Sequence, residues 1–396
     1  MPEKSVAAIN FDPFSSESIT DPYPTYQRLL AEAPVFHNAE RDVWAISRFD
    51  DVKGLVQDWE RLSSAQGVRI DDLLELAGPS PLTMDPPRHA LLRALVRKPF
   101  THRAMASLEP MVERSVNELL DAISGDTFDA ISEFAKLVPV TIICHLLGVP
   151  PHDARMLKSW ADAMLETVPG VQGSTPEAIT GARNLRTYWA NAIDERRAHP
   201  GDDILSVLAV SEVHGVPVPL DEQVGMCNLI FEAGNATTGT LIGNALLALA
   251  THPGERDWLE ATPEAMPEAI EEFLRWESPV QTLMRVTMTP LTLHGTTIPT
   301  GSRVLLVLGA ANRDPRVWDE PDELRLSRPV QRNLGFGEGI HHCLGAPLAR
   351  LEAPIALRAF LERFPSYDVV SSERFNDVTL RALRSLQVHA NPRGAS

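Results

Sequence analysis

The sequence predicts a mainly α-helical protein with small β-sheets at its edges. Helical periodicity dominates from residue 88 to about residue 200, and two longer helical segments follow over residues 220–251 and 344–364. Runs with the alternation or the β-branched content of strands are short. Neither an internal repeat nor a low-complexity linker divides the 396 residues, so we expect one domain over residues 1–396.

Short elements are expected in the N-terminal half. Residues 23–33 (YPTYQRLLAEA) are amphipathic and predict a helix, whereas residues 43–47 (VWAIS) predict a strand. Glycine and proline make residues 65–87 rich in loops. Helices should follow over residues 111–123 and 140–147, and Gly148 and Pro150 end the second of them.

The C-terminal half begins with the long segment 220–251. This segment is apolar on nearly all sides, so it should be a buried helix. Residues 290–308 alternate around His294 and Gly295, which predicts short strands joined by a turn. A last long helix is expected over residues 344–364, followed by strands and turns over residues 367–393.

Composition and charge exclude several classes of protein. Apolar residues make up 44% of the chain and charged residues 22%, which is typical of a globular protein. The net charge of −17 disfavours nucleic acids and anionic membranes as partners. Three cysteines (Cys144, Cys227 and Cys343) are too few for a disulfide framework. No secretion signal and no apolar run of membrane-spanning length is present, so we expect a cytoplasmic protein.

The strongest chemical signal is a loop around Cys343. Within ten residues it carries Phe336, Gly337, Gly339, His341, Cys343 and Gly345. The glycines allow a tight turn and close approach to a flat ligand, and the start of the following helix should favour a thiolate at Cys343. A lone cysteine is usually a buried apolar residue, but a chance match to the whole pattern is on the order of one in ten thousand.

The loop resembles the haem-binding signature of the cytochrome P450 family, F-x-x-G-x-[HR]-x-C-x-G, at every fixed position. The resemblance implies the cytochrome P450 fold and a haem b (iron protoporphyrin IX) whose iron is bound by Cys343. It also implies that Phe336, Gly337, His341 and Gly345 contact the haem. A thiolate donates electron density strongly to iron and favours oxygen activation.

Two further patterns resemble the same family. Glu272 and Arg275 match its Glu-x-x-Arg pair, with Arg328 as the implied third member. Such a pair alone is usually a solvated helix pair, but here it precedes the cysteine loop in the family's order. The resemblance further implies that His89, Arg93 and Arg285 bind the haem propionates together with His341.

The long helix carries residues 233–238 (AGNATT) where the family has [AG]-G-x-[DE]-T-[TS]. The resemblance implies that Ala233 lies at the haem and that the glycine after it allows the helix to bulge. It also implies that Thr237 and Thr238 are catalytic candidates. Ala236, however, replaces the acid that normally relays protons. Water or the substrate could supply the protons, Glu232 one turn earlier could substitute, or the enzyme could use peroxide.

The expected substrate pocket is formed by residues 66–83, 160–190, 229–237, 280–284 and 380–384. The candidates that line it are Leu229, Glu232, Ala233, Val280 and Leu283. These residues are mostly apolar, so a hydrophobic small molecule is the expected substrate. The carboxyl group of Glu232 could also orient an amine or a hydroxyl group there.

We therefore expect a monomeric haem-thiolate monooxygenase that inserts one atom of O₂ into a hydrophobic substrate. No length remains for a fused reductase, so electrons should come from a separate ferredoxin and ferredoxin reductase. Arg97, Lys98 and Arg350 could dock an acidic iron–sulfur partner. Two alternatives stay open: a peroxide-dependent or non-monooxygenase haem-thiolate enzyme, motivated by Ala236, and a non-catalytic haem or ligand-binding protein, which Thr237 argues against.

Overall fold

A computed structural model describes residues 9–70 and 78–391. Its α-helices are α1 (Ser16–Thr20), α2 (Tyr23–Glu32), α3 (Phe49–Gln57), α5 (Arg88–Leu95), α6 (His102–Ala122), α7 (Leu137–Leu147), α8 (Ala154–Ala163), α9 (Pro176–Ala198), α10 (Ile204–Ala209), α11 (Leu220–Thr251), α12 (Pro253–Ala261), α13 (Met266–Trp276), α14 (Leu308–Ala311) and α15 (Ala346–Arg363). Shorter helical turns are η1 (Pro81–Thr83), η2 (Lys98–Phe100), η3 (Ile131–Ala135), η4 (Pro263–Ala265) and η5 (Gly339–His341).

The strands are few and short, as the sequence predicts. They are β1 (Val35–Asn38), β2 (Val43–Ile46), β3 (Leu62–Ser63), β4 (Thr127–Asp129), β5 (Glu212–Val213), β6 (Val216–Pro217), β7 (Thr282–Thr287), β8 (Leu291–Leu293), β9 (Thr296–Ile298), β10 (Arg303–Val307), β11 (Ser366–Arg374) and β12 (Leu383–Asn391). The prediction of a mainly helical fold with small sheets is confirmed.

The largest sheet has five strands in the order β1-β2-β10-β7-β3, in which β10 runs parallel to β2 and the other pairs are antiparallel. A second sheet has the order β11-β12-β4. The hairpin β8–β9 turns at His294 and Gly295, both of which have positive φ (49° and 80°). Two such residues in succession form the type of turn that matches the twist of a hairpin.

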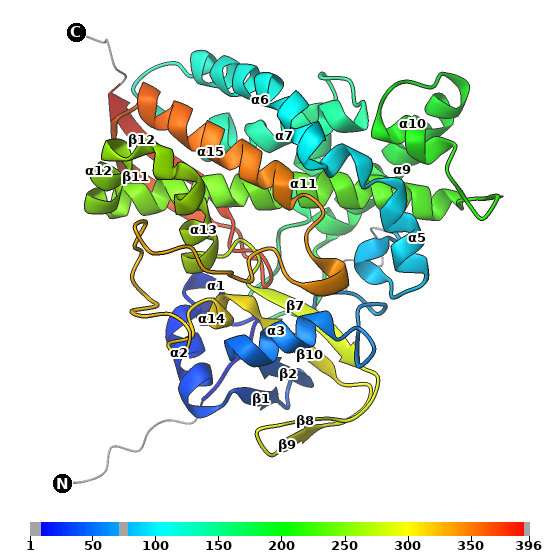
Figure 1. The fold of residues 1–396 in the computed structure, drawn as a ribbon, viewed down its shortest axis with the longest axis vertical. Coiled ribbons are helices and arrows are strands. Elements are labelled where there is room, and N and C mark those ends of the chain that lie inside the picture. The colour runs from blue at the N-terminus through cyan, green and yellow to red at the C-terminus, as the bar shows by residue number, and fades with distance from the viewer. Residues whose placement is uncertain (1–8, 71–77, 392–396) are drawn as a thin grey trace.

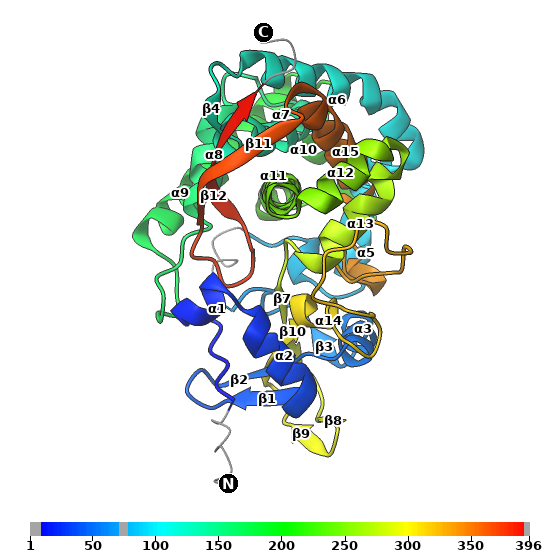
Figure 2. The same ribbon diagram turned by 90° about the vertical axis from the view of Figure 1, so that its left-hand side faces the viewer.

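Helix α11 is the central element of the molecule. It crosses the full width of the fold in Figure 1 and is seen end-on in Figure 2, with α12, α13 and α15 on one side and α8, α9 and the β11–β12 hairpin on the other. The five-stranded sheet lies at one end, next to α2 and α3. Twenty of the residues of α11 are buried, which confirms that the apolar segment 220–251 is an interior helix.

Helix boundaries differ from the predictions where proline is present. Helix α6 begins at His102 instead of residue 111 because Thr101 caps it, its side chain accepting a hydrogen bond from the amide of Ala104, and the helix continues through Pro110. Helix α15 begins at Ala346 instead of residue 344, with Pro347 in its first turn, where proline is tolerated. In the part of the chain that the structure describes, no helix is long and apolar enough to cross a membrane.

Candidate functional site

A cavity of about 360 Å³ lies between α11 and the loop that precedes α15. All five predicted substrate-contact residues line it, namely Leu229, Glu232, Ala233, Val280 and Leu283. Of the range 160–190, only Ala161, Asp162, Met164 and Leu165 reach the cavity, and of 380–384 only Leu380 does, so the expected ranges are wider than the observed lining. Residues 71–77 of the range 66–83 lie outside the described residues.

Cys343 lies in the wall of this cavity opposite α11. Its backbone amide donates a hydrogen bond to the carbonyl of Phe336 (2.9 Å), which closes the loop. Gly337 and Gly339 have positive φ (65° and 70°), and a side chain at Gly339 would lie 2.9 Å from the Cα of Gln57. Glycine is therefore required at Gly339 for both conformation and space.

The backbone amides at the start of α15 favour a thiolate at Cys343, as predicted, but burial of the thiol acts in the opposite direction and is the larger effect. Burial raises the pKa of the thiol, although backbone hydrogen bonds from Gly345 and Ala346 and the charge of Arg93 lower it. A coordinating metal ion deprotonates a thiol outright. The arrangement therefore fits a thiol that becomes a thiolate when iron binds.

Four predicted haem contacts meet beside the cysteine loop. Arg93 donates to the carbonyl of His342, and Arg285 donates to the carbonyl of Met284 (2.8 Å). Neither guanidinium forms an ion pair with a carboxylate of the described residues, and burial lowers the pKa of Arg285 to about 10. The rings of His89 and His341 are 4.5 Å apart.

The two histidines are neutral hydrogen-bonding groups. Burial lowers the pKa of His341 to about 3, with further lowering by Arg285, His89 and Arg93. Both ring nitrogens of His89 are buried without a partner among the described residues. Burying a cation or a ring nitrogen without a hydrogen-bond partner costs free energy. A bound group with two carboxylates at this end of the cavity would supply hydrogen-bond and ion-pair partners to these four residues. Arg93, Arg285 and His341 line the cavity, and His89 lies behind His341.

The opposite wall is formed by α11. Thr237 donates a hydrogen bond from Oγ1 to the carbonyl of Ala233 (2.8 Å), and Thr238 lines the cavity beside it. Helix α11 runs unbroken through Gly234, so the expected bulge is absent. A side chain there would lie 2.9 Å from Ile143 Cδ1, so this glycine allows α7 to pack closely. The methyl group of Ala236 packs against the cluster that contains Leu380.

Glu232 lies one helical turn before Ala236 and lines the same cavity. Burial raises the pKa of its carboxyl group to about 7, although a side-chain hydrogen bond from Asn228 and the charge of Arg69 lower it. A carboxyl group with this pKa can exchange a proton at neutral pH. The catalytic and binding roles assigned to Glu232, Thr237 and Thr238 stay predictions.

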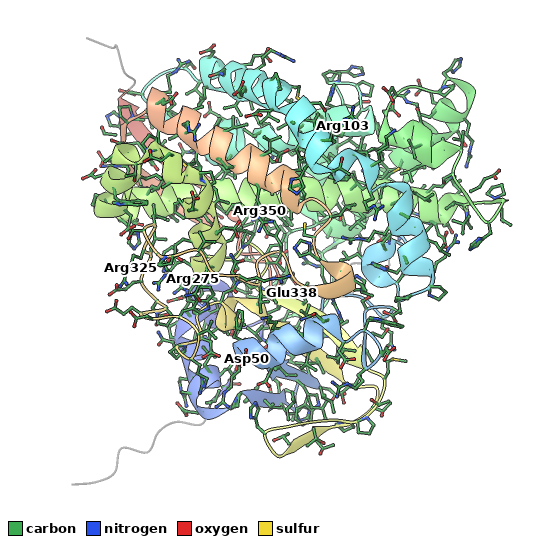
Figure 3. All side chains as sticks on the ribbon, in the orientation of Figure 1. Asp50, Arg103, Arg275, Arg325, Glu338 and Arg350 are labelled. Carbon is green, nitrogen blue, oxygen red and sulfur yellow. The ribbon has the colours of Figure 1, made fainter. Side chains whose placement is uncertain are left out.

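Glu272, Arg275 and Arg328 form a buried network that holds the segment after α14. Asn312 of that segment accepts a hydrogen bond from the amide of Leu334 (2.8 Å), two residues before the cysteine loop. Arg275 donates to both carboxylate oxygens of Glu272 (2.7 and 2.8 Å), and Arg328 donates to Oε1 (3.1 Å). The remaining donors of Arg275 bind the carbonyls of Asn312, Pro321 and Glu323. Figure 3 shows Arg275 deep in this region and Arg325 at its outer edge.

Several residues of the site were not predicted. Ser64 Oγ lies 3.1 Å from His341 Nε2, and Asp85 accepts hydrogen bonds from Ser63 and Ser64. Arg69 lies in the expected range 66–83 and lines the cavity, but its pairing with Asp377 at 3.0 Å was not expected. No short sequence pattern connects these residues, because they meet only through tertiary packing.

Comparison with known proteins places the chain in a family. The model of the family described as Cytochrome P450 matches residues 264–379. The chain is 40% identical to a "Putative cytochrome P450 123" of Mycobacterium tuberculosis over 364 residues, which cover 90% of each chain. It is 36% identical to "Cytochrome P450 monooxygenase PikC" of Streptomyces venezuelae, covering 93% of this chain and 91% of that one.

A solved structure agrees with the sequence relatives. The crystal structure of CYP109E1 from Bacillus megaterium in complex with testosterone matches with a TM-score of 0.87 and 33% identity, over 95% of this chain and 99% of that chain. The chain belongs to the cytochrome P450 family. It is a cytochrome P450 monooxygenase, with haem as its cofactor, which confirms the predicted family, fold, enzyme class and cofactor.

Proposed function

We propose that the protein hydroxylates, or otherwise oxidises, a hydrophobic small organic molecule bound in the 360 Å³ cavity. The observation that carries the proposal is that Cys343, from the loop before α15, and Thr237, from α11, line one largely apolar cavity. Testosterone bound to CYP109E1 supports a hydrophobic substrate. Leu229, Val280 and Leu283 supply the apolar contacts.

In this proposal the Cys343 thiolate holds the haem iron, and Arg93, Arg285, His89 and His341 hold the propionates. When bound, the haem supplies the redox chemistry that activates O₂. The part of the cavity proposed to hold the haem is lined by Ala233, Phe336, Gly337 and Gly345. The side chains thus orient the cofactor, and the apolar wall excludes water from the substrate.

We propose that Thr237 Oγ1 holds a proton at the cavity wall and passes it inward, with Thr238 beside it. Ala236 cannot relay a proton, so water or the substrate itself supplies protons to Thr237. The alternative of a peroxide-dependent enzyme is not favoured, because the chain's relatives include a named monooxygenase.

Electrons come from a separate ferredoxin and its reductase in this proposal, with the protein acting as a cytoplasmic monomer. Arg97 and Lys98 of the predicted set are exposed, as is Arg103, and Phe100 between them lines the same cavity as Cys343. Arg350 is exposed but pairs with Glu271 at 2.6 Å, so it contributes less free charge than predicted. Figure 3 labels Arg103 on α6 and Arg350 on α15 in the same view of the molecule. Such a surface attracts an acidic partner.

Product analysis after turnover tests the proposal. Candidate hydrophobic compounds are incubated with the protein, ferredoxin, ferredoxin reductase, NADPH and ¹⁸O₂. We expect one ¹⁸O atom in each oxidised product and no product without ferredoxin. Product formed only with hydrogen peroxide, or without the label, would contradict the monooxygenase assignment.

A further inference from the structure

The Glu232 carboxyl group is an unusual feature of an otherwise apolar cavity wall. The residue lines the cavity, yet its Oε1 atom is enclosed and has no hydrogen-bond partner among the described residues. An unsatisfied carboxyl oxygen in an apolar environment is unfavourable, because the desolvation of that atom is not compensated. A partner that enters with a ligand would remove this cost.

The carboxyl group is held in place from behind. Trp189 donates a hydrogen bond from Nε1 to Asn228 Oδ1 (3.3 Å), which leaves the Asn228 amide nitrogen to donate. The Asn228 side chain hydrogen-bonds the Glu232 carboxyl group from one turn earlier on α11. Because Trp189 and Asn228 are both buried, this chain fixes Glu232 before any ligand binds.

The other charged residues of the cavity wall already have partners or an assigned role. Asp162 pairs with Lys136 (2.8 Å) and Lys158 (2.5 Å), and Arg69 pairs with Asp377 (3.0 Å). In the proposed function, Arg93 and Arg285 bind the two propionate carboxylates of the haem, and the inference rests on that assignment. Among the described residues, Glu232 is therefore the charged group of the cavity wall that forms no ion pair, although the charge of Arg69, which pairs with Asp377, acts on it.

We propose that Glu232 selects substrates that combine an apolar body with a cationic nitrogen, which pairs with its carboxylate inside the cavity. A neutral ligand could fill the apolar volume but would leave the carboxylate uncompensated. A ligand carbonyl would be bound only by the protonated acid. A cationic nitrogen supplies both a hydrogen-bond or contact partner for the free oxygen and an ion-pair partner for the carboxylate, so it fits the observations best.

A matched pair of ligands tests this proposal. One ligand is an arylalkyl trimethylammonium ion, and the other is its neutral isostere in which a tert-butyl group replaces the trimethylammonium group. The quaternary nitrogen cannot coordinate iron and keeps its charge at every pH. Dissociation constants are measured from the spin-state shift of the Soret band and, independently, by calorimetry on the haem-loaded protein.

We expect the cation to bind wild-type protein about tenfold or more tightly than the isostere at pH 8. Its affinity should fall as the pH drops below about 7, where Glu232 becomes protonated. Asn228 acts on Glu232 through a hydrogen bond and Arg69 through its charge, and a guanidinium keeps its charge across this pH range. Glu232→Gln should abolish the preference and the pH dependence while binding the isostere at least as well.

The control variant is Glu212→Gln, which makes the same change at an exposed position and should keep the wild-type preference. Equal affinities of wild-type protein for both ligands, or a preference that survives in Glu232→Gln, would overturn the proposal. If Glu232→Gln instead binds both ligands like wild type but loses coupling of product to NADPH, Glu232 is a proton donor and not a selectivity residue. A thiolate-type ferrous–CO spectrum in the same samples shows that the proposed function stands independently of this outcome.

Discussion

Three titratable side chains around the cavity have pKa values displaced mainly by burial. His341 titrates near 3, Glu232 near 7 and Arg285 near 10, each shifted toward its neutral form. Desolvation disfavours the charged form of every one of them. A bound group of opposite charge placed beside one of these side chains would favour its charged form again.

The raised pKa of Glu232 predicts a pH-dependent stability. The folded protein binds this proton more tightly than the unfolded chain, whose carboxyl pKa is about 4.5. The stabilisation is fully present below about pH 4.5 and is lost as the pH rises through about 7. Relative to Glu232→Gln, wild type should lose on the order of 3 kcal/mol between pH 4.5 and pH 8.

Thermal unfolding of both proteins across this pH range measures the difference between their midpoints, with Glu212→Gln as the matched exposed control. A midpoint difference between wild type and Glu232→Gln that does not change with pH would show that the carboxyl group is already ionised below pH 7.

At the scale of elements, close helix packing depends on particular glycines. A Cβ atom at Gly225 of α11 would lie 2.1 Å from the carbonyl oxygen of Pro79, a backbone atom that cannot swing away. Gly225→Ala should therefore destabilise the protein by about 1–3 kcal/mol and weaken ligand binding, because Gly225 lines the cavity. Chemical denaturation and spectral titration check both effects.

Gly254→Ala in α12 is the matched control. A Cβ atom there meets nothing within 4 Å, and the residue is helical. Alanine should leave the fold unchanged or stabilise it by up to about 1 kcal/mol. If both substitutions have the same effect, the contact with Pro79 is not what limits residue 225.

The contact between α13 and the segment after α14 depends on the Glu272 network. Arg275 is 1% exposed and its guanidinium donates to a carboxylate and to backbone carbonyls. Lysine cannot reproduce this planar arrangement, so Arg275→Lys should cost about 3–5 kcal/mol and reduce haem retention. Arg325→Lys, at a half-exposed ion pair, should cost less than about 1 kcal/mol.

Haem content after purification and the midpoint of denaturation separate the two variants. Wild-type behaviour of Arg275→Lys would mean that the network does not support the cysteine loop.

The features that could be predicted from the sequence are those contained in a short, contiguous stretch of residues. The cysteine loop is contained within ten residues, and helix α11 matches the predicted bounds because prolines at 219 and 253 flank an apolar segment. In contrast, Arg69 and Asp377 are 308 positions apart, and their pairing depends on the whole fold. The effect of burial on the Cys343 thiol, which outweighs the backbone amides at the helix start, also depends on the whole fold and is not visible in the local pattern.

At the scale of the whole molecule, the negative net charge of −17 contrasts with the exposed basic residues near the cysteine loop. Arg97→Glu combined with Lys98→Glu should slow reduction by an acidic ferredoxin about tenfold or more at low salt, and the effect should shrink as salt is added. Stopped-flow reduction kinetics measure this effect. Arg155→Glu, an exposed control on α8, should leave the rate near wild type, and equal slowing by both would indicate an effect of net charge alone.

The identity of the iron ligand is the central claim, and the ferrous–CO difference spectrum tests it most directly. A thiolate ligand moves the Soret band of this complex to a clearly longer wavelength than a histidine ligand does. We predict the long-wavelength band for wild type and for Cys144→Ala, and its loss in Cys343→His with haem retained. A short-wavelength band in freshly reduced wild type, or a long-wavelength band that persists in Cys343→His, would contradict the account.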